Sequence, residues 1–97
     1  MNTYITLMKL TDQGVKNLKD APKRIEEGIK GVEKAGGKMI GFYLTFGEYD
    51  YIAISEGKSD EDAAAFNLAL SVQGNVRTLT LRAFTTKEFA DMLKKIP

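Results

Sequence analysis

The chain of 97 residues contains no cysteine and no histidine. Without cysteine it can form no disulfide, no thiolate nucleophile and no sulfur-ligated metal site, and a reducing compartment is compatible with its composition. Without histidine it lacks the commonest general base and the commonest nitrogen ligand of metals and haem. We therefore expect no metal and no cofactor, and catalysis by aspartate and tyrosine stays open.

A strong charge of one sign is also missing. The 14 lysines and arginines stand against 13 acidic residues, so the formal net charge is +1. Such a balance provides no general attraction for nucleic acid or for an anionic membrane surface. No segment approaches the roughly 18 apolar residues of a membrane-spanning helix, and the first residues lack the pattern of a signal peptide. We expect a cytoplasmic protein that binds neither nucleic acid nor membrane.

Hydrophobic periodicity is the strongest signal in the sequence. Hydrophobic residues make up 43% of the chain and charged residues 28%, and this composition and length predict a single domain over residues 1–97. Alternating apolar residues predict strands over 3–10, 38–46, 49–56 and 76–84. Apolar residues three and four apart predict helices over about 11–35, with a break near Asp20, and over about 59–72, and a short final helix capped by Thr86.

The order of these elements predicts a fold of the α+β class. Strand, helix, strand, strand, helix, strand and a terminal helix indicate a ferredoxin-like βαββαβ sandwich with an extra C-terminal helix. The four-stranded antiparallel sheet would have the order 4-1-3-2, with both main helices on one face. Residues 38–56 would form a hairpin that turns tightly at Gly47 and Glu48, where Gly47 would supply a positive φ.

Strict alternation divides the strand residues into two sets. We expect the aliphatic set to face the helices, namely Ile5, Leu7, Ile52, Ile54, Leu79 and Leu81. The set on the open face would then be Tyr4, Thr6, Met8, Tyr49, Tyr51, Ala53, Thr78, Thr80 and Arg82, together with Met39, Gly41, Tyr43 and Thr45 from the second strand. Such a face suits an interface or a cavity wall better than open water. We therefore expect a homodimer that forms through the open sheet face.

The same face supplies the candidate residues for a small-molecule site. The predicted ligand-binding residues are Tyr43, Tyr49, Tyr51, Thr78, Thr80 and Arg82. Arg82 could clamp a carboxylate or enolate oxygen, or it could pair with an acid across the dimer interface. For Asp50 a structural role and a catalytic role as general base both stay open. In the structural role it pairs with Lys9 or Arg77, or accepts backbone amides at the margin of the core.

Four segments resemble the GYD domain family: "LTDQGVKN", "PKRIEEG", "GGKMIGFYLTFGEYDYI" and "GNVRTLTLRAFTTKEFADML". The glycine, tyrosine and aspartate that give the family its name are present here as Gly47, Tyr49 and Asp50. The resemblance covers nearly the whole chain. It implies a dimeric α/β barrel of the ferredoxin-like type, in a family whose function is uncharacterised, so it assigns no chemistry.

Three functions are compatible with these residues. The first is a homodimeric small-molecule-binding or sensing protein with its pocket on the tyrosine-bearing sheet face. The second is a cofactor-free enzyme, of monooxygenase or isomerase type, that acts on a carbonyl or enolisable compound with Asp50 as base and Arg82 or tyrosine phenols at the oxyanion. The third is a structural interaction scaffold. The missing histidine and cysteine favour the first function over the second.

Overall fold

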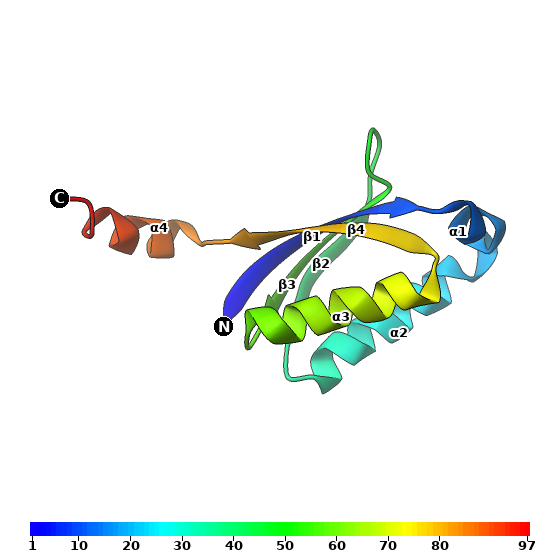
Figure 1. Cartoon of the computed structure of the whole chain (residues 1–97), viewed down its shortest axis with the longest axis horizontal. Coiled ribbons are helices and arrows are strands. Elements are labelled where there is room, and N and C mark those ends of the chain that lie inside the picture. The colour runs from blue at the N-terminus through cyan, green and yellow to red at the C-terminus, as the bar shows by residue number, and fades with distance from the viewer.

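A computed structural model describes all 97 residues (Figure 1). Four strands form one sheet in the order β2-β3-β1-β4, and every neighbouring pair is antiparallel. The strands are β1 (Asn2–Leu10), β2 (Lys38–Leu44), β3 (Tyr51–Gly57) and β4 (Val76–Ala83). This topology confirms the predicted ferredoxin-like α+β fold.

The helical segments also follow the predicted order. They are α1 (Asp12–Lys16), the 3₁₀ turn η1 (Leu18–Asp20), α2 (Ala21–Lys34), α3 (Asp60–Gln73) and α4 (Thr86–Leu93). The helical region is interrupted at Asp20, and α2 begins with Pro22 in its first turn. In that position the missing N–H of proline removes no intrahelical hydrogen bond. None of these helices is both long enough and apolar enough to cross a membrane.

Side-chain caps fix where the later helices begin. The Ser59 hydroxyl accepts the amide of Asp62 at 3.1 Å and caps α3. The cap of α4 is Thr85, one residue before the Thr86 predicted from sequence. Thr85 is the better cap because the side chain of Glu88 can reach back to the Thr85 amide, at 2.9 Å, while the Thr85 hydroxyl accepts the amide of Glu88.

The two long helices cover the face of the sheet that was predicted to be open. Figure 1 shows α2 and α3 side by side on one face. Beneath them lies a core of Met8, Tyr51 and Ala53, against which pack Leu10, Ile25, Met39, Phe42, Leu70 and Val76. The prediction that the aliphatic set faces the helices was therefore wrong.

Side-chain size explains this arrangement. Thr6 and Ala53 are small and buried, so they allow the helices to approach the centre of the sheet closely. Phe42 and Tyr51 fill the space beside them, with ring centroids 5.4 Å apart. The helices therefore need the mixed set of small and aromatic residues below them, and the uniform aliphatic set faces away.

The second strand contains an irregularity that alternation could not reveal. The register between β2 and β3 shifts between Met39 and Gly41, which indicates a bulge at Ile40. Met39 therefore lies with the core residues, whereas Gly41 and Tyr43 pair with the aliphatic residues of β3. The expectation that all three share one face was wrong.

The hairpin connection is longer than the predicted turn at Gly47 and Glu48. β2 ends at Leu44 and β3 begins at Tyr51, so residues 45–50 form the connection. The Asp50 amide donates to the Met8 carbonyl at 2.8 Å, and the Asp50 carbonyl accepts the Thr45 amide at 2.9 Å, so Asp50 ties the end of this loop both to β1 and to the residue that follows β2. Gly47 has a φ of +95°, the left-handed region in which a glycine carries no steric penalty.

Candidate functional site

No helix lies over the face of the sheet opposite α2 and α3 (Figure 1). We call this surface the aliphatic face, and it consists of Ile5, Leu7, Ile52, Ile54, Leu79 and Leu81, with Tyr43 at the β2 edge. The register places Leu7 between Ile52 and Leu79. Leu79 and Leu81 are each 47% exposed and Tyr43 is 56% exposed. A contiguous apolar surface of this kind is a candidate interaction surface.

A second apolar surface lies on the C-terminal arm, residues 84–97. Figure 1 shows β4 continuing out of the sheet into α4, which stands away from the rest of the molecule. Phe89, Met92 and Leu93 are spaced three and four apart, so they lie on one side of α4. All the large apolar residues of the arm are exposed: Phe84, Phe89, Met92, Leu93 and Ile96.

The chain exposes more surface than a compact monomer of its mass. Its accessible surface is 7011 Å². A compact monomer of 10.7 kDa exposes about 5,500 Å². The radius of gyration is 14.7 Å, against about 12.5 Å for a compact chain of this length. The molecule is therefore more extended, and exposes more surface, than a compact monomer of its mass.

A cavity lies between the helices and the tyrosine-bearing face of the sheet. Phe42 and Tyr51 line it from the sheet, and Ile25, Ile29 and Phe66 line it from α2 and α3. Its volume is about 100 Å³, whereas pockets for drug-sized ligands occupy about 300–1,000 Å³. The cavity is therefore smaller than a typical small-molecule site.

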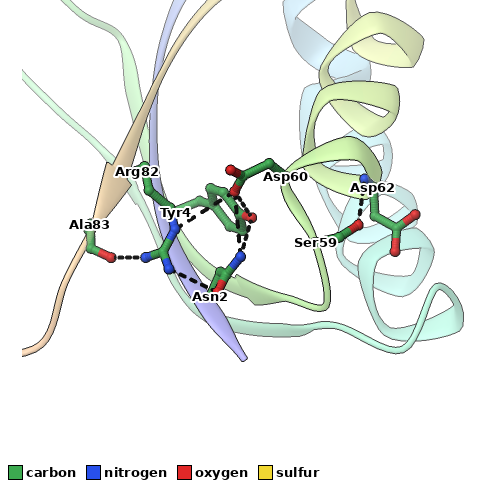
Figure 2. A network of polar contacts seen from close by, with 7 residues as sticks. All are labelled: Asn2, Tyr4, Ser59, Asp60, Asp62, Arg82 and Ala83. Carbon is green, nitrogen blue, oxygen red and sulfur yellow. Dashed lines mark hydrogen bonds and ion pairs between the residues drawn. The ribbon is translucent and has the colours of Figure 1, made fainter. Parts of the chain in front are cut away.

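A polar cluster closes one end of this covered face (Figure 2). The Tyr4 hydroxyl donates to Asp60 Oδ1 at 2.6 Å, and Arg82 Nε lies 3.7 Å from the same oxygen. Arg82 also donates to Asn2 Oδ1 at 2.8 Å and to the Ala83 carbonyl. Its guanidinium carbon lies 5.7 Å from the centre of the Tyr4 ring. The cluster joins β1, β4 and the first residue of α3, so the groups around Arg82 belong to its own subunit.

Tyr4 should make the free energy of unfolding fall as the pH becomes alkaline. Burial raises the pKa of its phenol above the ordinary 10.0, and the hydrogen bond to Asp60 raises it further, whereas Asn2 and Arg82 act in the opposite direction. Folding therefore favours the protonated phenol, and this stabilisation is complete below pH 10 and is lost as the pH rises through the raised pKa.

We expect Tyr4→Phe to remove this pH dependence. At about pH 8 the variant should be less stable by about 1 kcal/mol, because it lacks the hydrogen bond to Asp60. The difference should narrow as the pH rises above about 10 and through the raised pKa, because the variant has no phenol at position 4 to ionise. Thermal unfolding followed by circular dichroism measures both. Two parallel pH profiles would contradict the assignment.

Asp50 bonds to the main chain rather than to a cation. Its Oδ2 accepts the amide of Leu10 at 2.8 Å. Lys9, one of its two expected partners, lies 3.4 Å from Glu48 instead, and its Nζ is 5.3 Å from the centre of the Tyr49 ring. The other, Arg77, lies opposite Lys9 in the register of β1 and β4.

The residues predicted to form one small-molecule site do not converge. Asp50 bonds to Leu10 at one end of β1, and Arg82 pairs with Tyr4 near the other. Leu10 lies six residue steps along the strand from Tyr4, which corresponds to about 20 Å. The expected base, Asp50, is therefore far from the expected oxyanion group, Arg82. Arg82 is in addition already engaged by Asn2 and Asp60.

The predicted ligand-binding residues other than Arg82 are also dispersed. Tyr51 is buried in the core, and Tyr43 lies on the aliphatic face at the opposite edge of the sheet from Arg82. Thr80 accepts a hydrogen bond from the Asn67 side chain of α3 at 2.6 Å. Thr78 pairs with Met8, and Tyr49 lies in the loop before β3.

Sequence reasoning missed two features of the surface. The partnership of Tyr4 with Asp60 joins residues 56 positions apart, and nothing in the local sequence marks it. The spacing of Phe89, Met92 and Leu93 was visible and predicted the helix. That spacing could not reveal that α4 does not pack against the sheet or the other helices of its own subunit.

Comparison with known proteins places these features in a family context. The family model of the GYD domain matches residues 4–93. A curated protein of Thermus thermophilus, named glutamine synthetase and cystathionine beta-lyase binding protein, is 33% identical over 95 residues. The alignment covers 97% of this chain and 100% of that protein. No solved structure matches the chain.

Proposed function

This chain belongs to the GYD domain family, and from that membership and its uncovered aliphatic face we propose that it is a homodimeric protein-binding module. The binding of a further protein depends on the named relative, and the homodimer depends on the aliphatic face. This face offers a broad hydrophobic surface to another protein and no charged, convergent group to a substrate. The named relative supports the same class of function, because its name describes it as a binding protein for two enzymes.

We assign the aliphatic face to a second copy of the chain. A two-fold dimer brings the same patch of each subunit together, and interfaces that are permanently covered are more apolar than transient ones. An interface that covers about 800 Å² per subunit gains tens of kcal/mol from apolar burial, against an association cost of about 4–15 kcal/mol. Apolar burial of this size favours the dimer, and the fit of the two surfaces decides how much of the gain remains as affinity.

The name of the Thermus thermophilus relative suggests which other proteins this chain binds. We propose that this protein binds a glutamine synthetase or a cystathionine beta-lyase, and that it does so in the cytoplasm. The cavity of about 100 Å³ under the helices supports a small-molecule-sensing role less well, because it is below the usual size of a ligand pocket. The separation of Asp50 from Arg82 argues in the same way against the cofactor-free enzyme.

Binding to the two enzymes of the same organism tests this function. We expect titration of each purified enzyme, followed by calorimetry and sedimentation velocity, to give saturable binding to at least one with a dissociation constant of about 1 μM or below. Serum albumin at equal concentration serves as the control and should not bind. Failure of both enzymes to bind at about 100 times that concentration would contradict the proposed partner.

A further inference from the structure

We propose that the C-terminal arm of each subunit crosses to the second copy and packs its apolar side against it, so that the dimer is closed by exchanged arms as well as by the two sheets. This inference depends on the proposed dimer and extends its interface. The surface involved is the side of α4 that carries Phe89, Met92 and Leu93, together with Phe84 before the helix and Ile96 after it.

The exposed area of the chain is larger than an interface through the sheet alone would cover. The chain exposes 7011 Å², which exceeds the area of a compact monomer of its mass by about 1,500 Å². One partner in a standard interface contributes about 800 Å². Covering the aliphatic face alone therefore accounts for about half of the excess. The arm carries the largest remaining group of adjacent exposed apolar residues, and its burial would account for the rest.

The arm also contains a well-capped helix that is too short to be stable without packing against another surface. Thr85 and Glu88 form a complete capping box, and the hydrogen bond from the Thr85 amide lowers the pKa of Glu88. An isolated helix as short as α4 is marginal in water, and most helices are held by packing of their apolar side. In its own subunit α4 stands apart from the sheet and the other helices (Figure 1). The packing must come from another molecule.

The first residues of the arm direct it away from its own subunit. Arg82 donates to the Ala83 carbonyl, and its guanidinium carbon lies 4.5 Å from the centre of the Phe84 ring. Because the same guanidinium is held by Asn2 and Asp60, these contacts fix the chain where it leaves β4. The arm therefore continues along the strand direction, outward from the edge that carries Leu79 and Leu81.

The second copy is a better occupant than an enzyme partner. The arm starts at the rim of the aliphatic face, so a molecule seated on that face is the first that the arm meets. Five large apolar residues left exposed in the free protein would also promote aggregation. A partner that is always present removes this problem, and a second copy of the same chain is such a partner.

Full-length variants of the arm test the proposal. In Phe89→Glu/Leu93→Glu two charges replace the apolar contacts, whereas Lys87→Glu changes the net charge by the same amount on the opposite side of α4. We expect the double variant to raise the dimer dissociation constant about 100-fold or more, because buried aromatic and aliphatic anchors dominate interfaces. The control should stay within about twofold of wild type. Sedimentation equilibrium over a dilution series measures both.

A tryptophan reporter gives an independent readout. The chain has no tryptophan, so Phe89→Trp introduces a single one into the apolar side of the arm. We expect its emission to be blue-shifted in the dimer and to move to the red on dilution, with the same midpoint as dissociation. Emission typical of exposed tryptophan at every concentration would overturn the proposal.

Enzyme binding separates this inference from the proposed function. Measured above its own dimer dissociation constant, the double variant should still bind the enzyme that the wild-type protein binds. An unchanged dimer that has lost enzyme binding would make the arm an enzyme-binding element and overturn the exchange. A wild-type protein that is monomeric throughout would overturn both the exchange and the homodimer, whereas a dimer that binds neither enzyme would overturn only the proposed partner.

Discussion

Replacing Leu7 with glutamate is expected to convert the proposed dimer into a monomer of 10.7 kDa. Leu7 lies on the central strand β1, with Ile52 and Leu79 on either side of it, so it occupies the middle of the aliphatic face. Each subunit would lose the burial of one leucine, about 1.5–3 kcal/mol, and would have to bury an unpaired carboxylate at a cost of several kcal/mol more. Light scattering on a size-exclusion column measures the mass directly.

The matched control for this change is Leu68→Glu. Leu68 is a leucine on α3 with 66% of its side chain exposed, on the opposite side of the sheet from the aliphatic face. The control should remain dimeric. Leu7 is partly buried within its own subunit, so Leu7→Glu should also lose some stability, and circular dichroism should first show that both variants are folded. A Leu7→Glu protein that stays dimeric at low micromolar concentration would show that the second copy does not cover this face.

The order of the elements could be predicted because it depends on local chemistry. Pro22 marks the break before α2, Ser59 marks the start of α3, and Gly74, with a φ of +80°, ends that helix. Each of these signals acts within a few residues. The one-residue error at the start of α4 arose because Thr85 and Thr86 are adjacent and either could accept an amide. Glu88 decides between them.

The identity of the covered face could not be predicted in the same way. Alternation along β1 places Leu7 on one face and Met8 on the other, but it does not say which face its own helices will cover. The usual preference for burying aliphatic residues indicated the wrong one, because that preference does not distinguish burial under a helix from burial under a second subunit. Ala53 and Thr6 were the informative residues, since small side chains beneath a helix allow close packing.

The predicted site residues are dispersed for a related reason. Arg82 was expected to lie near both Tyr4 and Tyr43, and it lies near Tyr4. The bulge at Ile40 reverses the facing of the residues that follow it in β2, and β2 and β4 are opposite edges of the sheet. Tyr43 therefore lies on the opposite edge strand from Arg82 and on the opposite face of the sheet. A bulge changes facing without any change of residue type, so the sequence gives no sign of it.

Removing the Asp50 carboxylate is expected to destabilise the fold by about 2–4 kcal/mol. Its Oδ2 accepts the Leu10 amide at 2.8 Å, and its own amide donates to the Met8 carbonyl at 2.8 Å, so one residue holds the hairpin loop against β1 at two points. Asp50→Ala leaves the partly buried Leu10 amide without an acceptor. Asp50→Asn keeps an acceptor oxygen but loses the charge, so we expect a smaller loss of about 1 kcal/mol.

The exposed acid of the same loop, Glu48, provides the control. Glu48 lies 3.4 Å from Lys9 with both side chains largely in solvent, and Glu48→Ala should change stability by less than about 0.5 kcal/mol. Urea unfolding of all variants should be compared at one fixed protein concentration, because the stability of a dimer depends on concentration. The ranking Asp50→Ala, then Asp50→Asn, then Glu48→Ala follows from the hydrogen bond to Leu10. An Asp50→Ala protein as stable as wild type would mean that the fold does not need this carboxylate, and would return Asp50 to consideration as a general base.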